Sequence, residues 1–427
     1  MAGARGIPGP PARPVVGHLH LLKKPLHRSL AALAARHGGG AGGLLLLRFG
    51  ARPVLLVSSP AAACECFTAH DVALAGRPGL ASRRLLPDDC PAIATASYGP
   101  LWRRLRRLDA TAAARDAGAR DMVGKLWRAG PGSVAVKATA YEFVVNVITA
   151  MVAGKRMQQE EVLRLKAMTE AAHAATGAAN RHDFIPVLRL LDLGRTARKL
   201  AALAKERHQF GQSLCSSEAE TPRTVIGDLL REQERSPEPL DDVVIRTVCL
   251  SLLQGGTDTS SSTIETAEII STVGTSRLLQ ESDLANMPYL RCIVTETLWL
   301  HPVAPNLPPH EASRGFTVAG GHAIGRGTVV LVDRDPRVWD EPEKFTPERF
   351  LEAKVDDDEG TRWRWMMPFG MGRRRCPGEG LALRTVGVAL GVMVQCFEWE
   401  RGGREEVDLS EGSAGITMPM AMPLMAM

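Results

Sequence analysis

The chain has 427 residues, 45% of them hydrophobic and 23% charged, which is enough apolar material for a large folded core and excludes a disordered chain. Its 52 Lys and Arg residues against 47 Asp and Glu residues leave a net charge of +5, too small to indicate a nucleic-acid partner without a concentrated basic patch. The eight cysteines form no Cys-x-x-Cys pair and no zinc-type spacing, so we expect reduced and mostly buried side chains.

The N-terminal residues 1–14 are rich in proline, glycine and arginine and contain no continuous apolar region. Four prolines between Ile7 and Pro14 exclude a regular helix and favour a stiff extended segment. Elsewhere we find no window that approaches the roughly 18 apolar residues of a membrane-spanning helix, since the best stretch, Val386 to Phe397, is too short. We therefore expect no secretory signal and no membrane span.

The remaining chain predicts a mainly α protein with small β-sheets. Helical spacing of apolar residues is found at His27 to Arg36, over most of Ala61 to Cys292, and at Gly380 to Phe397. Short apolar runs bounded by turn residues predict strands at Leu44 to Phe49, Pro53 to Ser58, Phe316 to Val318 and Thr328 to Val332. The first two of these runs are close enough to form a hairpin.

One helical stretch, Leu240 to Glu265, contains the run Gly-Gly-Thr-Asp-Thr-Ser that begins at Gly255. Each glycine disfavours helix by about 1 kcal/mol relative to alanine, so we expect a weakened helix whose hydroxyl side chains take up freed backbone carbonyls. Taken alone, the same small residues fit a close crossing of two helices equally well.

A second run, Trp-Arg-Arg-Leu-Arg, places Trp102 and Arg106 on one helical face at positions i and i+4. Without further context, a solvated basic face is the usual explanation for such a run.

The most specific run is Pro-Phe-Gly-Met-Gly-Arg-Arg-Arg-Cys-Pro-Gly, from Pro368 to Gly378. A thiolate that faces a flat cofactor needs glycines for close backbone approach, and amide hydrogens and positive charge to keep it ionised. A helix that starts after Pro377 adds the positive end of its dipole near the sulfur. The alternative explanations are a buried structural cysteine beside a surface arginine cluster, or a basic localisation signal.

The loop resembles the haem-binding loop of cytochromes P450, and the whole chain resembles plant microsomal members of that family, the isoflavone-hydroxylase-like group. The resemblance implies the mainly α cytochrome P450 fold with small β-sheets. Residues 1–14 would be a proline-rich lead-in without the family's membrane anchor, and residues 15–427 would form a single large haem domain. It implies haem as cofactor, with Cys376 as the axial ligand of the iron. The implied haem-binding residues are Trp102, Arg106, His310, Phe369, Gly372, Arg374, Cys376 and Gly378.

By the same resemblance, Gly255 and Gly256 leave space over the iron, and Asp258 and Thr259 relay protons to bound dioxygen. The implied activity is O2-dependent oxidation of a small lipophilic substrate of the secondary-metabolite kind. Electrons would come from NADPH through a separate NADPH-cytochrome P450 reductase, because the chain has no nucleotide-binding fingerprint of its own. The family works on the cytosolic face of the endoplasmic reticulum, so we expect attachment to that membrane surface or a cytosolic location, and no nucleic-acid partner.

The chain departs from the family in a charged network and at three gaps. Glu296 and Arg349 match the network, but the family's third member, an arginine, is Trp299 in this chain. Residues are missing after Arg107, after Glu265 and before Arg334. A charge left short of a partner in a buried site destabilises a fold by several kcal/mol, so the alternative to an enzyme is a catalytically silent relative, with or without haem.

Overall fold

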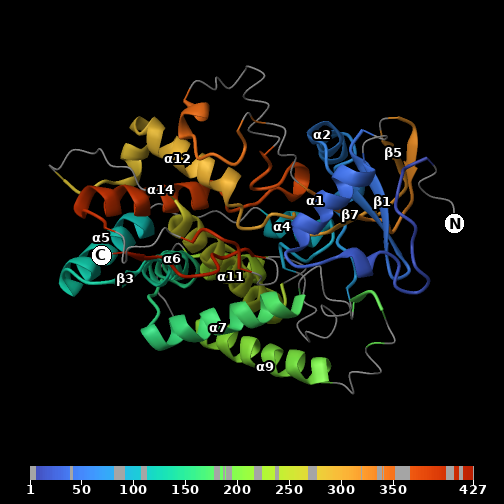
Figure 1. The fold of residues 1–427 in the computed structure, drawn as a ribbon. Helices are drawn as coiled ribbons and strands as arrows, with labels where there is room; N and C mark the ends of the chain where they lie inside the picture. Colours follow the sequence, from blue (N-terminus) through green and yellow to red (C-terminus); the bar gives the residue numbers. More distant parts are fainter. Residues whose placement is uncertain are drawn as a thin grey trace.

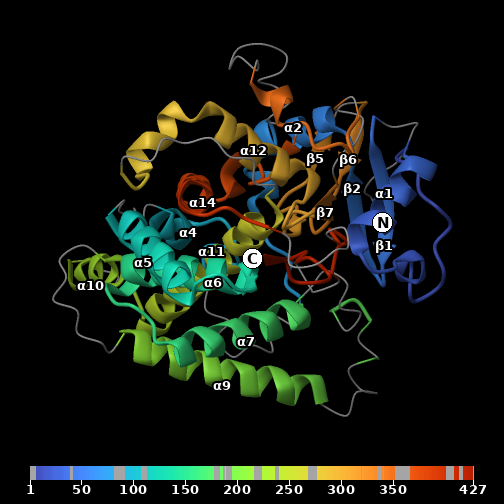
Figure 2. The ribbon, with the colours of Figure 1, turned by 60° about the vertical axis from the view of Figure 1, so that its left-hand side comes forward.

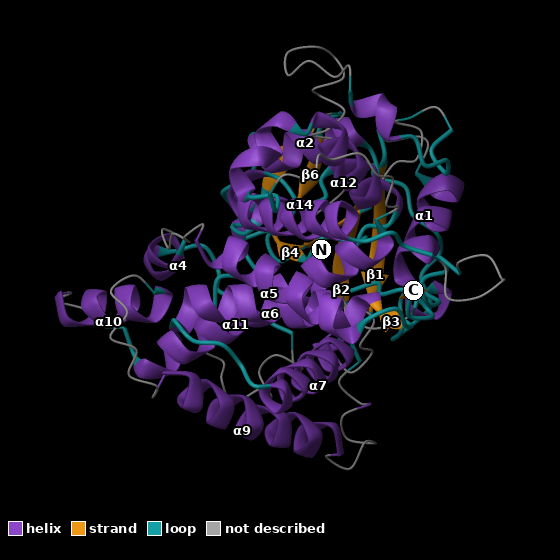
Figure 3. Cartoon of the chain, turned by 90° about the vertical axis from the view of Figure 1, so that its left-hand side faces the viewer, coloured by secondary structure: helices purple, strands orange, loops and turns teal. Residues whose placement is uncertain are grey.

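The structure of the protein is a computed structural model. It describes residues 6–38, 42–80, 92–106, 113–176, 183–185, 188, 195–215, 224–235, 240–267, 277–318, 320–333, 339, 341–351, 366–400, 408–412 and 417–426. Within these ranges the chain is mostly helical with small β-sheets, as the sequence predicted (Figures 1 and 3). Residues 81–91 lie outside the described ranges, as do the positions directly after Arg106 and Ala267.

Along the chain, a helix and a pair of strands come first, a long run of mainly helical segments follows, and most of the short strands come late. The helices are α1 (Leu26–His37), α2 (Pro60–Thr68), α4 (Pro100–Leu105), α5 (Ala113–Ala129), α6 (Val136–Ala153), α7 (Gln159–Thr176), α9 (Arg195–Cys215), α10 (Val225–Arg235), α11 (Asp242–Thr266), α12 (Pro288–Leu300) and α14 (Glu379–Cys396). The strands are β1 (Leu44–Phe49), β2 (Arg52–Val57), β3 (Val134–Ala135), β4 (His310–Glu311), β5 (Phe316–Val318), β6 (His322–Ile324), β7 (Val329–Val332) and β8 (Met425–Ala426).

The largest described sheet has the strand order β1-β2-β7-β4. β1 and β2 form the predicted antiparallel hairpin, and β7 joins β2 in parallel, with Val54 opposite Val329. The short strand β4 then pairs with β7 and brings His310 opposite Val330. The sheet therefore positions His310 beside residues from the first fifth of the chain.

Helix α11 runs through the middle of the helical part and packs against α6 on one side and α14 on another (Figure 2). Its start is fixed by the Asp241 side chain, which accepts a hydrogen bond from the Val243 N–H at 2.9 Å. The helix continues without a break through Gly255 and Gly256, so the predicted weakening produces no interruption. Packing on several sides supplies more stability than two glycines remove.

Two helices, α6 and α14, are long and apolar enough to cross a membrane by length and composition, so the expectation that no stretch reaches this length was wrong. In the α6 window 72% of the residues are buried inside the protein, and in the α14 window 50%. Both belong to the large hydrophobic core that α11 completes. Their apolar character is accounted for by this packing.

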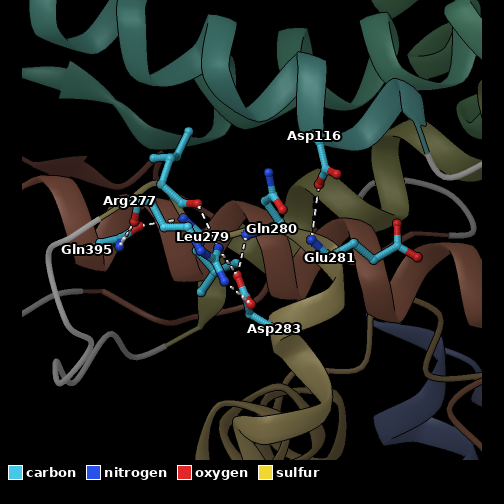
Figure 4. Close-up of polar contacts among 8 residues, drawn as sticks. Asp116, Arg277, Leu279, Gln280, Glu281, Asp283 and Gln395 are labelled. Carbon is cyan, nitrogen blue, oxygen red and sulfur yellow. Dashed lines mark hydrogen bonds and ion pairs between the residues drawn. The ribbon is translucent and has the colours of Figure 1, made fainter.

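On the far side of the gap predicted after Glu265, the chain is fastened to two helices (Figure 4). Arg277 pairs with both carboxylate oxygens of Asp283, at 2.6 Å each. The Gln395 side chain on α14 donates to the Arg277 carbonyl at 2.6 Å, and the Glu281 N–H donates to Asp116 on α5 at 3.1 Å. These contacts tie the segment from Arg277 to Asp283 to α14 and α5.

Candidate functional site

The loop that carries Cys376 is a tight turn built around glycines. Gly372 has a φ of +66°, and a Cβ added there would lie 2.3 Å from the Phe67 carbonyl oxygen on α2. Only glycine combines this backbone conformation with so close an approach. The Cys376 N–H donates to the Phe369 carbonyl at 2.8 Å, which closes the turn just before α14 begins.

The Cys376 side chain is accessible to solvent but has protein atoms around most of it. This burial raises the pKa of the thiol above its ordinary value, while the Gly378 N–H and the Arg106 guanidinium act in the opposite direction without offsetting it. The sequence predicted that the loop alone would keep the thiol ionised. Desolvation of the Cys376 thiol outweighs the effects of the Gly378 amide and the Arg106 cation on its pKa.

The three arginines of the loop do not supply the expected charge to the sulfur, because each is engaged elsewhere. Arg373 pairs with Asp71 at 2.8 Å, and Arg375 forms an ion pair with Glu379. Arg374 donates to the backbone carbonyl oxygens of residues 75, 93 and 96. The basic run is therefore internally neutralised or structural rather than a free cationic surface.

Trp102 and Arg106 lie on one face at the end of α4, as their spacing predicted. The Arg106 Cζ lies 5.8 Å from the Trp102 ring centroid, and Arg374 covers the same ring at 4.9 Å. The Trp102 indole N–H donates to the Ile93 carbonyl at 3.1 Å, so its hydrogen is already used within the protein. Among the described residues no carboxylate pairs with Arg106, and burial lowers its pKa while the Cys376 thiol raises it.

His310 is buried between β4 and the segment before α4. Its Nδ1 lies 2.8 Å from the Leu74 carbonyl oxygen, and because a carbonyl only accepts, Nδ1 carries the hydrogen. Burial, reinforced by the positive charges of Arg77 and Arg374, lowers the pKa of His310 to about 3. The imidazole is therefore neutral, and its Nε2 is an acceptor until it gains a second proton.

The two glycines of α11 face different surroundings. Gly255 is exposed in the middle of an otherwise buried helix, and a Cβ added there would meet no atom within 4 Å. A Cβ on Gly256 would lie 2.6 Å from Ile148 Cδ1 on α6. The side of α11 at Gly255 is therefore open, whereas the side at Gly256 is filled by Ile148. The close approach at Gly256 fits the helix crossing that was the alternative explanation.

Asp258 and Thr259 also point to different partners. The Thr259 hydroxyl donates to the Gly255 carbonyl one turn earlier, at 2.8 Å. The Asp258 carboxylate lies 3.7 Å from His173 Nδ1 on α7, and the Thr417 hydroxyl lies 3.4 Å from the same nitrogen. Burial lowers the pKa of His173 more strongly than Asp258 raises it. The sequence indicated neither His173 nor Thr417, because the approach of α7 and of the C-terminal segment is a tertiary feature.

The charged network behind the loop keeps two of its members. Glu296 on α12 is completely buried; one carboxylate oxygen accepts the Thr346 N–H at 2.8 Å, and the other lies 3.1 Å from Arg349 Nε. Burial raises the pKa of Glu296, and these partners oppose the shift. The predicted pair is therefore formed in the absence of the third residue.

Trp299 fills the third position with an aromatic cluster. Its indole N–H donates to the Pro342 carbonyl at 3.0 Å, and its ring meets Trp339 edge to face at 6.4 Å between centroids. Trp339 in turn packs against Phe350 at 5.1 Å and lies under Arg349 at 5.5 Å. Aromatic packing thus occupies the place of a guanidinium, a feature that sequence reasoning did not anticipate.

The observed arrangement fits a haem better than a metal ion held by several side chains. No group of three or more His, Cys, Asp or Glu side chains within the described ranges could hold a metal ion. The chain instead offers one accessible thiol at the start of a core helix, with Arg106, a cation without a carboxylate partner in the described part of the chain, beside it. Together with the helix face opened at Gly255, these features are compatible with a cysteine-ligated haem.

Comparison with known proteins identifies the family. The cytochrome P450 family model matches residues 7–424. Cytochrome P450 81Q32 of Catharanthus roseus is 38% identical, with 99% of this chain and 91% of that protein covered. (+)-Piperitol/(+)-sesamin synthase CYP81Q2 of Sesamum radiatum is 39% identical (98% and 90% covered), and isoflavone 3'-hydroxylase of Medicago truncatula is 35% identical (98% and 91% covered). The chain belongs to the cytochrome P450 family, whose members, these relatives among them, are monooxygenases.

The alignments also bear on the gaps. The alignment with the Catharanthus protein runs over 467 positions, although this chain has 427 residues. That relative therefore contains segments without a counterpart in this chain, in agreement with the predicted presence of internal gaps.

Proposed function

We propose that this chain is a haem-thiolate monooxygenase that inserts one atom of O2 into a small lipophilic substrate of plant secondary metabolism. The observation that carries the proposal is the accessible Cys376 thiol at the start of α14, in a loop that only glycine at position 372 allows. When bound, haem iron supplies the oxygen chemistry, and a thiolate ligand favours O–O cleavage. We assign the remaining roles to residues of the chain as follows.

Haem binding is assigned to the two sides of the Cys376 loop. Cys376 would ligate the iron, with Phe369, Gly372 and Gly378 shaping the loop around the sulfur. Arg106 would hold a haem carboxylate, because it is a desolvated cation with no carboxylate partner among the described residues. Trp102, His310 and Arg374 would lie beside the same carboxylates. The Trp102 N–H and the Arg374 guanidinium stay bonded to backbone carbonyls and fix the position of Arg106, and His310 would need a second proton before its Nε2 could donate to a carboxylate.

Proton delivery is assigned to Thr259, whose hydroxyl lies beside the open face at Gly255. Its hydrogen bond to the Gly255 carbonyl holds the oxygen in one position, from which it can pass a proton onward. Asp258 would pass the proton to Thr259. Because the Asp258 carboxylate is paired with His173 on α7, it must first turn away from that histidine. Gly255 leaves room for small molecules, and Gly256 keeps α11 close to α6.

The electron donor and the location follow from the proposed chemistry. Monooxygenation consumes two electrons per turnover, and we assign them to NADPH through a separate NADPH-cytochrome P450 reductase. Attachment to the cytosolic face of the endoplasmic reticulum fits this partner, and a cytosolic form would need to meet it in solution. No nucleic-acid partner is proposed, and the engagement of Arg373, Arg374 and Arg375 within the protein supports that.

The second candidate is a catalytically silent member of the family, and Trp299 is the observation that favours it. The buried pair of Glu296 and Arg349 argues that the fold tolerates this change, whether or not turnover does. Haem incorporation without product formation would identify this case.

The test is a turnover assay with purified protein, added plant reductase, NADPH and a panel of isoflavone and lignan substrates, followed by mass spectrometry. The proposal predicts a product that is one oxygen atom heavier, or a dehydrogenated product of the methylenedioxy-bridge kind. The matched variant Thr259→Ala should retain haem but lose most of the product per NADPH consumed. A haem-loaded protein that forms no product with any member of the panel, and consumes NADPH no faster than the reductase alone, would support the silent alternative.

A further inference from the structure

Two cysteines outside the candidate haem site lie together where α9 meets α11. Cys215 is the last residue of α9 and is partly exposed, whereas Cys249 lies in the first half of α11 and is fully buried. Their side chains are within hydrogen-bond distance of each other. None of the roles proposed above uses either thiol.

The helix crossing explains why the two thiols meet. A Cβ added to Gly211 on α9 would lie 3.1 Å from Leu250 Cδ1 and 3.4 Å from Arg246 Cβ on α11. Gly211 and Cys215 are one helical turn apart, so they share a face of α9. Cys249 lies three residues after Arg246 and adjoins Leu250, on the face of α11 that receives them. A glycine therefore lets the helices approach at the level of the sulfur atoms.

The surroundings make the two thiols unequal. Lys155 donates to the Ser213 carbonyl at 3.4 Å, close to the end of α9, and Arg246 lies on the facing turn of α11. The hydrogen bond from Cys249, together with these charges, lowers the pKa of Cys215, whereas the same hydrogen bond and burial raise the pKa of Cys249. An accessible, acidic thiol beside a buried, protonated partner is the arrangement of a reactive and a resolving cysteine.

We propose that Cys215 and Cys249 form a peroxide-sensitive pair that closes to a disulfide between α9 and α11. Hydrogen peroxide would oxidise the Cys215 thiolate to a sulfenic acid, its O–O bond breaking and one oxygen leaving as water after protonation. The Cys249 sulfur would then attack the sulfenic sulfur and release a second water. Two electrons leave the sulfur pair and reduce one peroxide, and a dithiol reductant reverses the step. This chemistry requires neither haem nor turnover.

The consequence is a covalent connection between a helix of the outer layer and the helix that carries Gly255 and Thr259. In the reduced chain, α9 is held to α11 by side-chain packing around Gly211. A disulfide of normal geometry brings the joined backbones to a fixed, short separation. The oxidised form should therefore restrict separation of these two helices.

The experiment uses the full-length protein, first fully reduced and then exposed to a series of hydrogen peroxide concentrations. Remaining thiols are alkylated, and the digest is analysed by mass spectrometry with and without reductant. We expect one cross-linked peptide pair containing Cys215 and Cys249, lost on reduction, at peroxide concentrations that leave Cys292 alkylated. Cys292 is a buried single cysteine on α12, so Cys292→Ser is the matched control and should leave the cross-link unchanged.

Two results would overturn the proposal. One is continued alkylation of Cys215 at peroxide concentrations that already oxidise Cys64, a partly exposed cysteine on α2. The other is oxidation of Cys215 to sulfinic acid in the wild-type protein without any bond to Cys249. In Cys249→Ser the proposal predicts a Cys215 sulfenic acid that a dimedone probe traps, and a variant too unstable to purify leaves the wild-type measurement decisive.

Discussion

Replacement of Trp299 tests whether this residue stabilises the fold or damages the charged network of Glu296 and Arg349. The side chain is 4% exposed, and a tryptophan buries about 150–250 Å² on folding, worth about 4–6 kcal/mol at 25 cal/mol per Å². Truncation in Trp299→Ala should therefore lower the free energy of unfolding by about 3–5 kcal/mol. Trp299→Phe keeps a ring against Trp339 but leaves the Pro342 carbonyl without its donor. This loss should lower the free energy of unfolding by about 1 kcal/mol.

The decisive variant is Trp299→Arg, which introduces the residue that the family carries. Because Glu296 is already paired with Arg349 and hydrogen-bonded to Thr346, a second arginine adds a buried cation and removes the edge-to-face contact. Its aliphatic part recovers some burial, so we expect a net loss of about 2 kcal/mol or more.

The assay is the urea midpoint followed by far-UV circular dichroism, with haem retention measured on the same samples. Trp127→Ala is the matched control, since Trp127 is 74% exposed on α5 and its truncation should change stability by no more than about 0.5 kcal/mol. A Trp299→Arg protein that is more stable than wild type, or retains more haem, would refute the reasoning and show that Trp299 is a lesion.

Three further predictions address the candidate haem site. His310 has a folded pKa of about 3 against about 6.5 unfolded, so its contribution to stability is present above pH 6.5 and falls by up to about 1.4 kcal/mol per unit as the pH drops from there toward 3. His310→Asn, which can still donate to the Leu74 carbonyl, should therefore flatten the pH profile of the unfolding midpoint in that window, and an unchanged slope would exclude the assignment. Arg106→Gln removes the carboxylate-binding cation and should weaken haem affinity by about 10-fold or more, measured by haem transfer to apomyoglobin; unchanged affinity would show that Arg106 does not contact the cofactor. Gly372→Ala forces a Cβ to within 2.3 Å of the Phe67 carbonyl at a φ of +66°, and should destabilise the loop by about 1–3 kcal/mol with loss of haem; normal haem content in this variant would contradict the loop geometry.

The sequence predicted those parts of the fold that depend on local pattern. The hairpin of β1 and β2 follows from two apolar runs with turn residues between them, and α11 follows from its apolar spacing. The face shared by Trp102 and Arg106 needs only the helical period. The spacing of the residues from Pro368 to Gly378 was enough to predict the loop that carries Cys376.

What the sequence did not predict depends on which distant segment approaches each side chain. The motif placed Gly255 and Gly256 in one role, whereas the approach of Ile148 from α6 separates them. Similarly, Asp258 lies beside His173 on α7, whereas the adjacent Thr259 bonds to the Gly255 carbonyl. No local pattern records these approaches.

The charge around the Cys376 loop also depends on distant segments. A run of three arginines before Cys376 suggested a cationic setting for the sulfur, yet Asp71 and Glu379 take two of them, and backbone carbonyls take the third. Burial then decides the direction of the thiol pKa.

The central claim is that Cys376 binds haem iron as a thiolate, and the visible spectrum of the reduced, carbon monoxide-treated protein tests it most directly. The claim predicts a strongly red-shifted Soret band that is abolished in Cys376→Ser and unchanged in Cys292→Ser, the matched buried cysteine. Absence of haem from the wild-type protein, or the shorter-wavelength band of a non-thiolate haem in both wild type and Cys376→Ser, would contradict it.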